Sequence, residues 1–266
     1  MKIFINEKIR NIPEGTKLLD LRDQMKKNAD VIVYNGFIVK DNLELKDDDR
    51  VVFIKKKEMP LQEDMEAMLV SRHTPLVHEK VKKYTVGIAG LGGLGSNVAI
   101  SLARIGIGKL LLVDFDVVEP SNLNRQQYFI RHSGMNKTDA LEEVIKDCNP
   151  FVNIEKKNVF LDRDNIENIF KDVDIIVEAF DNPTSKAVIV NTVLQKMKDK
   201  KIVSASGMAG YFTGNTIVSK RVNDKFYLIG DRVNEVKPGQ GLMAPRVAIA
   251  ANHQANTVLR IILGEE

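Results

Sequence analysis

The chain has 266 residues, 44% of them hydrophobic and 28% charged, which is ordinary for a globular protein of one or two domains. Its 39 basic and 36 acidic side chains leave a net charge of +3, too small to indicate binding to nucleic acid or to an anionic membrane. A single cysteine, Cys148, excludes an intramolecular disulfide and any site built on paired cysteines. The sequence shows neither a basic-then-apolar leader nor an apolar run of about 18 residues, so we expect a cytoplasmic protein.

Residues 1–57 carry the pattern of a small domain of their own. Alternating apolar residues predict a hairpin over residues 2–12, and residues 18–25 have the spacing of a short helix. A strong turn signal, Asn35-Gly36, separates the strands of a second hairpin, and residues 51–54 are expected to form a last strand. This order of elements is typical of a β-grasp, or ubiquitin-like, domain.

Residues 58–70 are expected to form a linker and a short helix. The linker includes Pro60, and the apolar residues from Leu61 to Leu69 have the spacing of an amphipathic helix. Residues 71–266 then form the second domain.

The second domain is organised around a glycine-rich stretch. An apolar run over residues 86–89 leads into four glycines within six positions, and a helical pattern follows from Asn97. In such a strand, turn and helix, the backbone N–H groups are free to face a phosphate, which any Cβ would hold away. The residues concerned are Gly90, Gly92, Gly93, Leu94 and Gly95. A second apolar run ends in Asp114, placed where a ribose-binding acid follows this turn in doubly wound folds.

Helical and extended patterns alternate through the rest of the chain. Helices are expected over residues 138–146, 164–170, 183 onward and 247–263. Parallel strands are expected over residues 152–159, 175–177 and 202–205, and antiparallel strands within 210–219 and 226–229. This alternation predicts an α/β fold with a doubly wound, mostly parallel, Rossmann-like sheet behind the β-grasp domain.

Four polar motifs are expected at the carboxyl edge of this sheet with the glycines. They are Asp114-Phe115-Asp116, the string from Ser121 to Gln126, Gly134-x-x-Lys137, and Asp181-Asn182. Arg125 and Lys137 are suited to hold a triphosphate and to stabilise charge on pyrophosphate. A carboxylate such as Asp181 is suited to magnesium. A nicotinamide dehydrogenase would have no use for the arginine string or the lysine, so the sequence favours that class least.

Together these motifs resemble the ThiF-like adenylyltransferases related to ubiquitin-activating enzymes, over residues 61–264. The resemblance implies that a carrier protein's C-terminal glycine carboxylate attacks the α-phosphate of ATP, giving an acyl-adenylate and pyrophosphate. It implies that Asp114 binds the ribose of ATP, that Asp116 beside it also contacts the nucleotide, and that Asp181 binds magnesium. It assigns the phosphates to the glycine turn and to Asn122, Arg125, Gln126 and Lys137.

The same resemblance implies a homodimer in which each subunit lends an arginine to its partner's site. Arg72 is the best match, and a solvated helix end is the alternative interpretation. The zinc-binding Cys-x-x-Cys pairs found in many relatives are absent from the sequence, so no structural zinc is expected. A crossover-loop cysteine is absent from residues 207–246 as well. The reaction is therefore expected to stop at the adenylate, with sulfur delivered by another protein.

The first domain resembles the ThiS-like sulfur carriers of thiamine biosynthesis, through residues 33–39 and 45–51. Those carriers end in a reactive Gly-Gly, whereas this segment continues through Lys55-Lys56-Lys57 and has no diglycine. It therefore cannot be activated as a carrier. A stabilising or dimer-forming domain, a docking domain, and a decoy that competes with the true carrier all remain open.

The sequence thus predicts an ATP- and magnesium-dependent adenylyltransferase of a separate ubiquitin-like sulfur carrier, in thiamine biosynthesis. One alternative is adenylation of another carrier or of a peptide carboxylate. A second alternative is a non-catalytic, carrier-binding regulator.

Overall fold

The computed structural model describes residues 1–6, 8–57, 62–74 and 76–266. Its contacts divide the chain into two compact units, residues 1–79 and residues 80–266. The predicted linker falls partly on residues 58–61, which lie outside the described residues, and helix α2 spans Gln62–Val70. The short helix α3 spans Val77–Val81.

The first unit contains a five-stranded mixed sheet in the order β2-β1-β5-β3-β4. Its elements are β1 (Lys2–Ile5), β2 (Lys8–Asn11), α1 (Leu18–Met25), β3 (Val31–Tyr34), β4 (Phe37–Val39) and β5 (Arg50–Ile54). The two hairpins are antiparallel, and β1 pairs with β5 in parallel. Asn35 and Gly36 have φ values of 49° and 88°, which a tight hairpin turn requires. Ile3, Leu18 and Phe53 join the sheet to α1 in one apolar core. The arrangement confirms the predicted β-grasp fold.

The second unit contains a seven-stranded sheet in the order β11-β12-β10-β9-β6-β7-β8. The strands are β6 (Thr85–Ala89), β7 (Lys109–Asp114), β8 (Asn153–Asn158), β9 (Ile175–Glu178), β10 (Lys201–Ala205), β11 (Val218–Arg221) and β12 (Phe226–Gly230). Every pairing in this sheet is parallel except that of β11 with β12. The predicted doubly wound, mostly parallel sheet is therefore confirmed.

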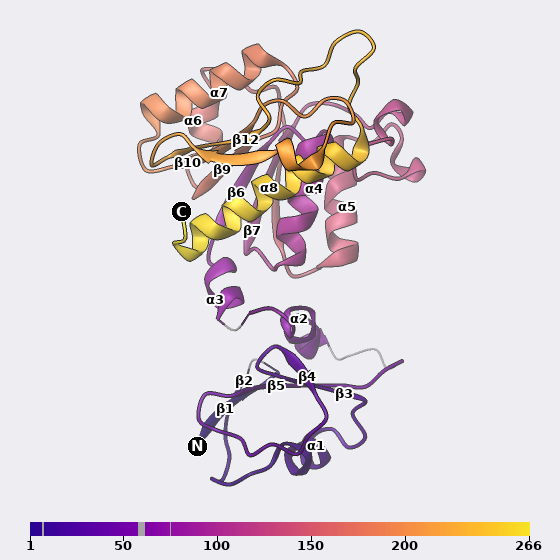
Figure 1. Ribbon diagram of the computed structural model, residues 1–266, viewed down its shortest axis with the longest axis vertical. Coiled ribbons are helices and arrows are strands. Elements are labelled where there is room, and N and C mark those ends of the chain that lie inside the picture. Colours follow the sequence, from indigo (N-terminus) through magenta and orange to yellow (C-terminus); the bar gives the residue numbers. More distant parts are fainter. Residues whose placement is uncertain (7, 58–61, 75) are drawn as a thin grey trace. The chain divides into compact units, whose positions relative to one another are not determined.

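Helices cover both faces of this sheet, as Figure 1 shows. They are α4 (Gly93–Arg104), α5 (Lys137–Cys148) and α8 (Ala244–Leu263) on one face, and α6 (Ile166–Ile169) and α7 (Pro183–Lys196) on the other. Ile189 and Val193 of α7 are fully buried against strand residues such as Ile176. On the opposite face, α8 packs closely on α4 through buried small residues that include Ala250 and Ala251.

The chain reverses its direction of travel across the sheet at β6. From β6 it moves outward to β7 and β8, and it then returns to place β9 on the other side of β6. Loops leaving the carboxyl ends of β6 and β9 therefore diverge, and this is where open α/β sheets bind ligands.

One strand prediction is wrong. Residues 210–217 do not form a strand, and only Val218–Arg221 pairs with β12. The guanidinium of Arg246 donates to the carbonyl oxygens of Phe212 and Thr213 at 2.8 and 2.7 Å, and to the Thr216 hydroxyl at 3.0 Å. These bonds hold the segment in a turn instead of a ladder.

None of the helices in the described ranges combines the length and the apolar character needed to cross a membrane.

Candidate active site

A cavity of about 660 Å³ lies at the carboxyl ends of the central strands. We call its two parts the β7 end and the β10 end. The β7 end is lined by the glycine turn, the segments that follow β7 and β8, and the side chains of Arg125, Gln126 and Lys137. The β10 end is lined by residues 205–209, at the end of β10 and just after it, and by Asn234, Glu235, Val236 and Leu242. Asp181 and Lys186 also line the cavity, from the loop after β9 and from α7.

The glycine turn closes so tightly that it needs glycine at several positions. Gly90 has a φ of +90°, and a Cβ on Gly95 would lie 1.9 Å from the carbonyl oxygen of Gly90. Gly92 differs, since a Cβ there would meet its nearest neighbour only at 3.8 Å. Gly95 thus serves the packing of α4 on the turn, while Gly92 and the first turn of α4 present backbone to the cavity. A helix start of this kind attracts anions.

Asp114 fastens the glycine turn to the end of β7. Its carboxylate accepts hydrogen bonds from the backbone N–H groups of Leu91, at 2.6 Å, and Asp116, at 2.9 Å. The residue is 8% exposed, and this burial raises the pKa of Asp114 although nearby Lys137 opposes the shift. Each oxygen keeps a second lone pair that a hydroxyl donor can use.

Lys137 brings a buried positive charge to the same end. Its Nζ lies 2.8 Å from Oδ2 of Asp116, and its backbone N–H donates to the carbonyl of Asp116 at 2.9 Å. The side chain is 8% exposed. The first residue of α5 is therefore locked onto the segment after β7, which fixes the ammonium at the cavity wall.

The loop before α5 adds two polar side chains with unused capacity. Nη1 of Arg125 donates to Oδ1 of Asn124 at 2.9 Å, but its buried Nε has no hydrogen-bond partner among the described residues. Oε1 of Gln126 is buried and equally without a described partner. Unsatisfied buried polar atoms in a cavity wall are costly unless a ligand or water completes them. The β7 end therefore fits a ligand that is polar and highly charged.

Two of the remaining predicted residues, Asn122 and Arg72, are not part of the cavity lining. Asn122 is outside the cavity lining, and its Oδ1 accepts from the backbone N–H of Glu119 at 3.2 Å, which caps a short turn. Arg72 is exposed in the turn after α2 and belongs to the unit of residues 1–79. Gly90, Gly92, Gly93, Leu94, Asp116 and Asp181 line the cavity. The roles assigned to all of these residues stay predictions.

Sequence reasoning missed a buried polar cluster beneath the cavity. Glu178, fully buried at the end of β9, accepts from Nζ of Lys186 at 2.9 and 3.2 Å and from the hydroxyl of Ser204. Lys186 also donates to the carbonyl oxygen of Ala205 at 2.8 Å. The cluster ties α7 to the ends of β9 and β10. The one signal in the sequence that could have indicated this cluster is Glu178, an acidic residue at the end of an apolar strand.

A second buried ion pair holds the β10 end. Nη2 of Arg246 lies 2.5 Å from Oδ2 of Asp231, and the two side chains are 3% and 6% exposed. Burial alone would raise the pKa of Asp231, but hydrogen bonds from Asn234, Val233 and Arg246 outweigh it and lower the pKa to about 2. The pair thus connects the start of α8 with the loop after β12.

Within the described part of the chain, no group of three or more His, Cys, Asp or Glu side chains is arranged to hold a metal ion. A cation at this site would therefore need ligands from a bound substrate as well as from the protein.

Two family models match the chain. Residues 66–266 match the ThiF family, and residues 1–57 match the ThiS-like ubiquitin family. The chain is 32% identical over 194 residues to adenylyltransferase and sulfurtransferase UBA4 of Candida glabrata, covering 70% of this chain and 44% of that protein. It is 29% identical over 198 residues to ubiquitin-like modifier-activating enzyme 5 of Xenopus laevis, covering 69% and 45%. The chain thus spans less than half the length of these curated relatives.

Two solved structures show the same fold. The E. coli tRNA N6-threonylcarbamoyladenosine dehydratase TcdA, solved in complex with ATP, is 20% identical with a TM-score of 0.68, covering 78% of this chain and 98% of that one. E. coli MccB, solved with AMPCPP and MccA, is 22% identical with a TM-score of 0.56, covering 76% and 64%. The match over residues 66–266 shows that the chain belongs to the ThiF family, with a ThiS-like ubiquitin domain at residues 1–57.

Proposed function

We propose that this protein uses ATP to adenylate the C-terminal glycine carboxylate of a separate ubiquitin-like sulfur carrier, in the thiazole branch of thiamine biosynthesis. The observation that carries the proposal is one cavity with two unlike ends. The β7 end offers cations, unsatisfied polar atoms and a glycine turn, while the β10 end is lined mainly by small and apolar residues. Membership of the ThiF family, with relatives named adenylyltransferase and ubiquitin-like modifier-activating enzyme, supports the same reaction.

In this proposal the β7 end binds ATP. The triphosphate lies along the glycine turn and the start of α4, where Arg125 and Lys137 offset its negative charge. The ribose hydroxyls donate to the carboxylates of Asp114 and Asp116. Asn122 and Gln126 complete the phosphate contacts once the loop before α5 closes on the nucleotide.

The carrier's tail enters through the β10 end. A carboxylate oxygen of its last glycine attacks the α-phosphorus, and the bond from that phosphorus to the bridging oxygen breaks. Pyrophosphate leaves with the electron pair, and the carrier keeps AMP as an acyl-adenylate. The protein contributes positioning and fixed positive charge, with no covalent step of its own. A separate sulfur donor then acts on the adenylate.

Asp181 fits a magnesium site. Its carboxylate is exposed at the cavity wall between the two ends, and oxygen ligands are those that Mg²⁺ prefers. When bound there with ATP, Mg²⁺ would neutralise phosphate charge. The role of Asp181 itself would be to hold that ion at the cavity wall.

The proposal also includes a homodimer in which Arg72 of one subunit reaches the active site of its partner. Each subunit would consist of a β-grasp domain (1–57), a linker with a short helix (58–70) and an adenylyltransferase domain (71–266). Mixing inactive Arg72→Ala subunits with inactive Lys137→Ala subunits should restore activity, because one hybrid site then carries both intact residues. No recovery after mixing would contradict the action of Arg72 across the dimer, and full activity of Arg72→Ala alone would place Arg72 outside the reaction.

ATP–pyrophosphate exchange tests the reaction, measured with a diglycine-ended carrier and magnesium. Arg125→Ala and Asp181→Ala should each lower exchange by about 100-fold or more while leaving the far-ultraviolet circular dichroism spectrum unchanged. The matched control is Arg131→Ala, because Arg131 lies on the same loop as Arg125 but pairs at the surface with Asp147. Wild-type exchange in the two site variants would remove their assigned roles.

Mass spectrometry identifies the substrate. Incubation with ATP should add AMP to the carrier and not to peptides that lack a ubiquitin-like fold. An adduct on a peptide alone would contradict the carrier assignment. Tight carrier binding without any adduct would instead make the protein a non-catalytic regulator.

A further inference from the structure

The sheet of the first unit has a second apolar face. Ile32, Val51 and Phe53 belong to the core that packs on α1, so the residues that alternate with them point to the opposite side of the sheet. Val33 and Val52 pair across β3 and β5 on that side, and they are only 1% and 3% exposed. A part of the molecule other than α1 therefore covers this face.

The cover is the segment that follows the β-grasp domain. Residues 62–74 and 76–79, which we call the arm, belong to the same compact unit, although the ThiS-like match ends at residue 57. Ala67 and Val70 lie three residues apart on one face of α2 and are 3% and 6% exposed. Val70 lines a cavity of about 30 Å³ together with the two valines of the sheet, so the packing is close. Figure 1 shows α1 and α2 on opposite sides of the sheet.

Polar contacts fasten the far end of the arm. The guanidinium of Arg50, at the start of β5, pairs with the carboxylate of Glu79. The same guanidinium lies 4.2 Å from the ring centroid of Phe4, which alternates with the core residues of β1 and so shares the covered face. Within the arm, a ring nitrogen of His78 lies 3.3 Å from the carboxylate of Glu66 in α2. The arm is therefore attached to the sheet at two places and braced between them.

Arg72 lies in the turn between these attachments. Ser71 is 8% exposed, and its hydroxyl donates to the carbonyl oxygen of Met68 at 2.8 Å. The backbone N–H of His73 donates to the carbonyl oxygen of Val70 at 2.9 Å. Arg72 itself is exposed, so the fixed turn presents its side chain outward. An arginine on a fixed turn loses less conformational freedom on binding than one on a free chain.

We infer that the β-grasp domain positions Arg72 for the adenylation reaction by holding the arm against its second sheet face. The inference rests on the proposed function, in which Arg72 acts at the partner's site. It gives a role to a domain that cannot be activated as a carrier. Because the chain's own arm covers the second face, a separate protein cannot dock there, which argues against a docking or decoy role through that face. Val70 and Arg50 are then positioning residues that act through Arg72.

Val70→Asp tests this role. A carboxylate is costly to bury beside apolar side chains, so the arm should leave the sheet. Arg72 would then be misplaced, and ATP–pyrophosphate exchange by the full chain should fall by roughly 10- to 100-fold. Leu69→Asp is the matched control, because it makes the same change at the neighbouring residue of α2, which is 41% exposed. It should exchange at the wild-type rate.

Non-additivity separates positioning from a general loss of stability. The double variant Val70→Asp/Arg72→Ala should exchange no more slowly than Arg72→Ala alone, since an arm without its arginine has nothing left to position. In subunit mixing, Val70→Asp should behave as Arg72→Ala does. It should regain activity with Lys137→Ala subunits, which supply an intact arm, and should not regain activity with Arg72→Ala subunits.

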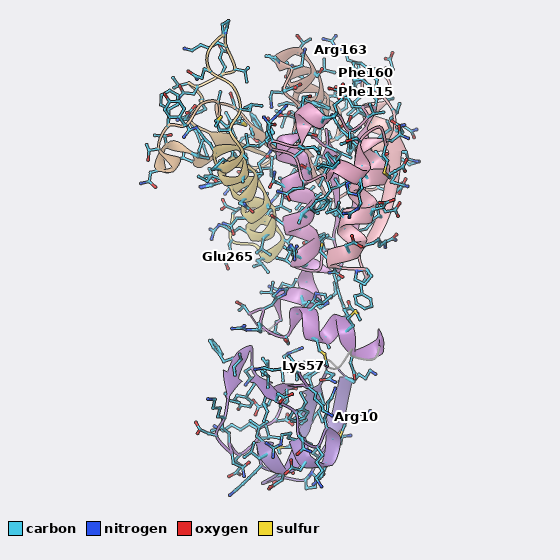
Figure 2. All side chains as sticks on the ribbon, turned by 90° about the vertical axis from the view of Figure 1, so that its right-hand side faces the viewer. Arg10, Lys57, Phe115, Phe160, Arg163 and Glu265 are labelled. Atoms are coloured by element: carbon cyan, nitrogen blue, oxygen red, sulfur yellow. The ribbon has the colours of Figure 1, made fainter. Side chains whose placement is uncertain are left out.

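Arg50→Met weakens the attachment from the side of the sheet. Exchange should fall by roughly 5-fold, less than in Val70→Asp, because the apolar contacts of the arm remain. Arg10→Met is the control. Arg10 is exposed on the edge strand β2 (Figure 2) and pairs with Ile3, whose side chain belongs to the core on the α1 face, so it lies on the face that the arm does not cover.

Wild-type exchange in Val70→Asp and Arg50→Met, with Arg72→Ala impaired, would overturn the inference and leave the proposed function standing. Effects that multiply in the double variant would overturn it as well, because the arm would then act independently of Arg72. Full activity of Arg72→Ala would remove the inference but not the adenylation. No exchange by the wild type would remove the proposed function itself.

Discussion

The two ends of the cavity are built in opposite ways. At the β7 end, short stretches of chain turn back on themselves, and backbone groups and charged heads face the space between them. Asp114, for example, bonds to Leu91 and to Asp116 within a compact turn and strand end. At the β10 end, the wall is made mainly of small and apolar residues and is held from behind by a buried ion pair, Asp231 with Arg246.

Under the proposed function, this difference would suit two substrates of different chemistry. A compact, highly charged ligand needs fixed cations and donors, which the β7 end provides. An extended polypeptide tail needs room and a mainly small and apolar wall, which the β10 end provides, with Glu235 as the acidic side chain in its lining. A substitution that removes the interactions holding one end should therefore impair binding at that end and leave binding at the other end intact.

Arg246→Met should have the largest effect on stability. The substitution leaves the buried carboxylate of Asp231 without its partner, together with the carbonyls of Phe212 and Thr213. Removing one partner of a buried pair costs about 3–5 kcal/mol, and urea unfolding would measure the loss. Under conditions in which Arg246→Met remains folded, it should still bind inorganic tripolyphosphate, because the β7 end is built from other elements.

Arg221→Met is the control for this change. Arg221 pairs with Asp224 at 2.7 Å, but the two side chains are 47% and 91% exposed. Solvent screens such a pair, so its loss should lower the free energy of unfolding by about 0–1 kcal/mol. Equal losses in the two variants would show that the buried pair does not hold the β10 end.

Gly95→Ala should damage the β7 end instead. The new methyl group would lie 1.9 Å from the carbonyl oxygen of Gly90, so the start of α4 must shift away from the turn. Such overpacking costs about 1–3 kcal/mol and should weaken ATP binding as well. Gly241→Ala is the matched control, because a Cβ there meets nothing within 4 Å. Normal ATP affinity in Gly95→Ala would contradict the tight-turn account.

The pH dependence of stability should report on Asp231. Its pKa is about 2 in the folded protein and about 3.9 in an unfolded chain, so its ionised form stabilises the fold. This contribution, roughly 2–3 kcal/mol, is complete above about pH 5 and is lost as the pH falls through about 2. The stability difference between wild type and Asp231→Asn, from urea midpoints, should shrink across that window. A constant difference would show that Asp231 does not titrate as the geometry requires.

Most of the residues that the sequence singled out for the β7 end do line it, because their determinants are local, and their roles stay predictions. Glycine spacing, an acid at a strand end and Lys137 at a helix start lie within short stretches, and each is a recognisable signal. The β10 end depends on pairs such as Glu178 with Ser204, 26 residues apart, for which no periodicity or spacing exists. The wrong strand prediction over residues 210–217 has a similar cause. The side chain that holds this segment in a turn, Arg246, lies about 30 residues further along the chain and gives no local signal.

The smallest predicted effect separates the substrates directly. Val236 lines the β10 end and is 60% exposed, so Val236→Glu should leave the fold intact. Its carboxylate would add to that of neighbouring Glu235, repel the incoming terminal carboxylate of a carrier and raise the carrier's KM by roughly 10-fold, about 1.4 kcal/mol. The affinity for ATP should not change. Val233→Glu is the control, because Val233 is 79% exposed and outside the cavity lining. If both variants raised the KM equally, general surface charge would explain the effect, and the β10 end would lose its role as the entrance for the tail.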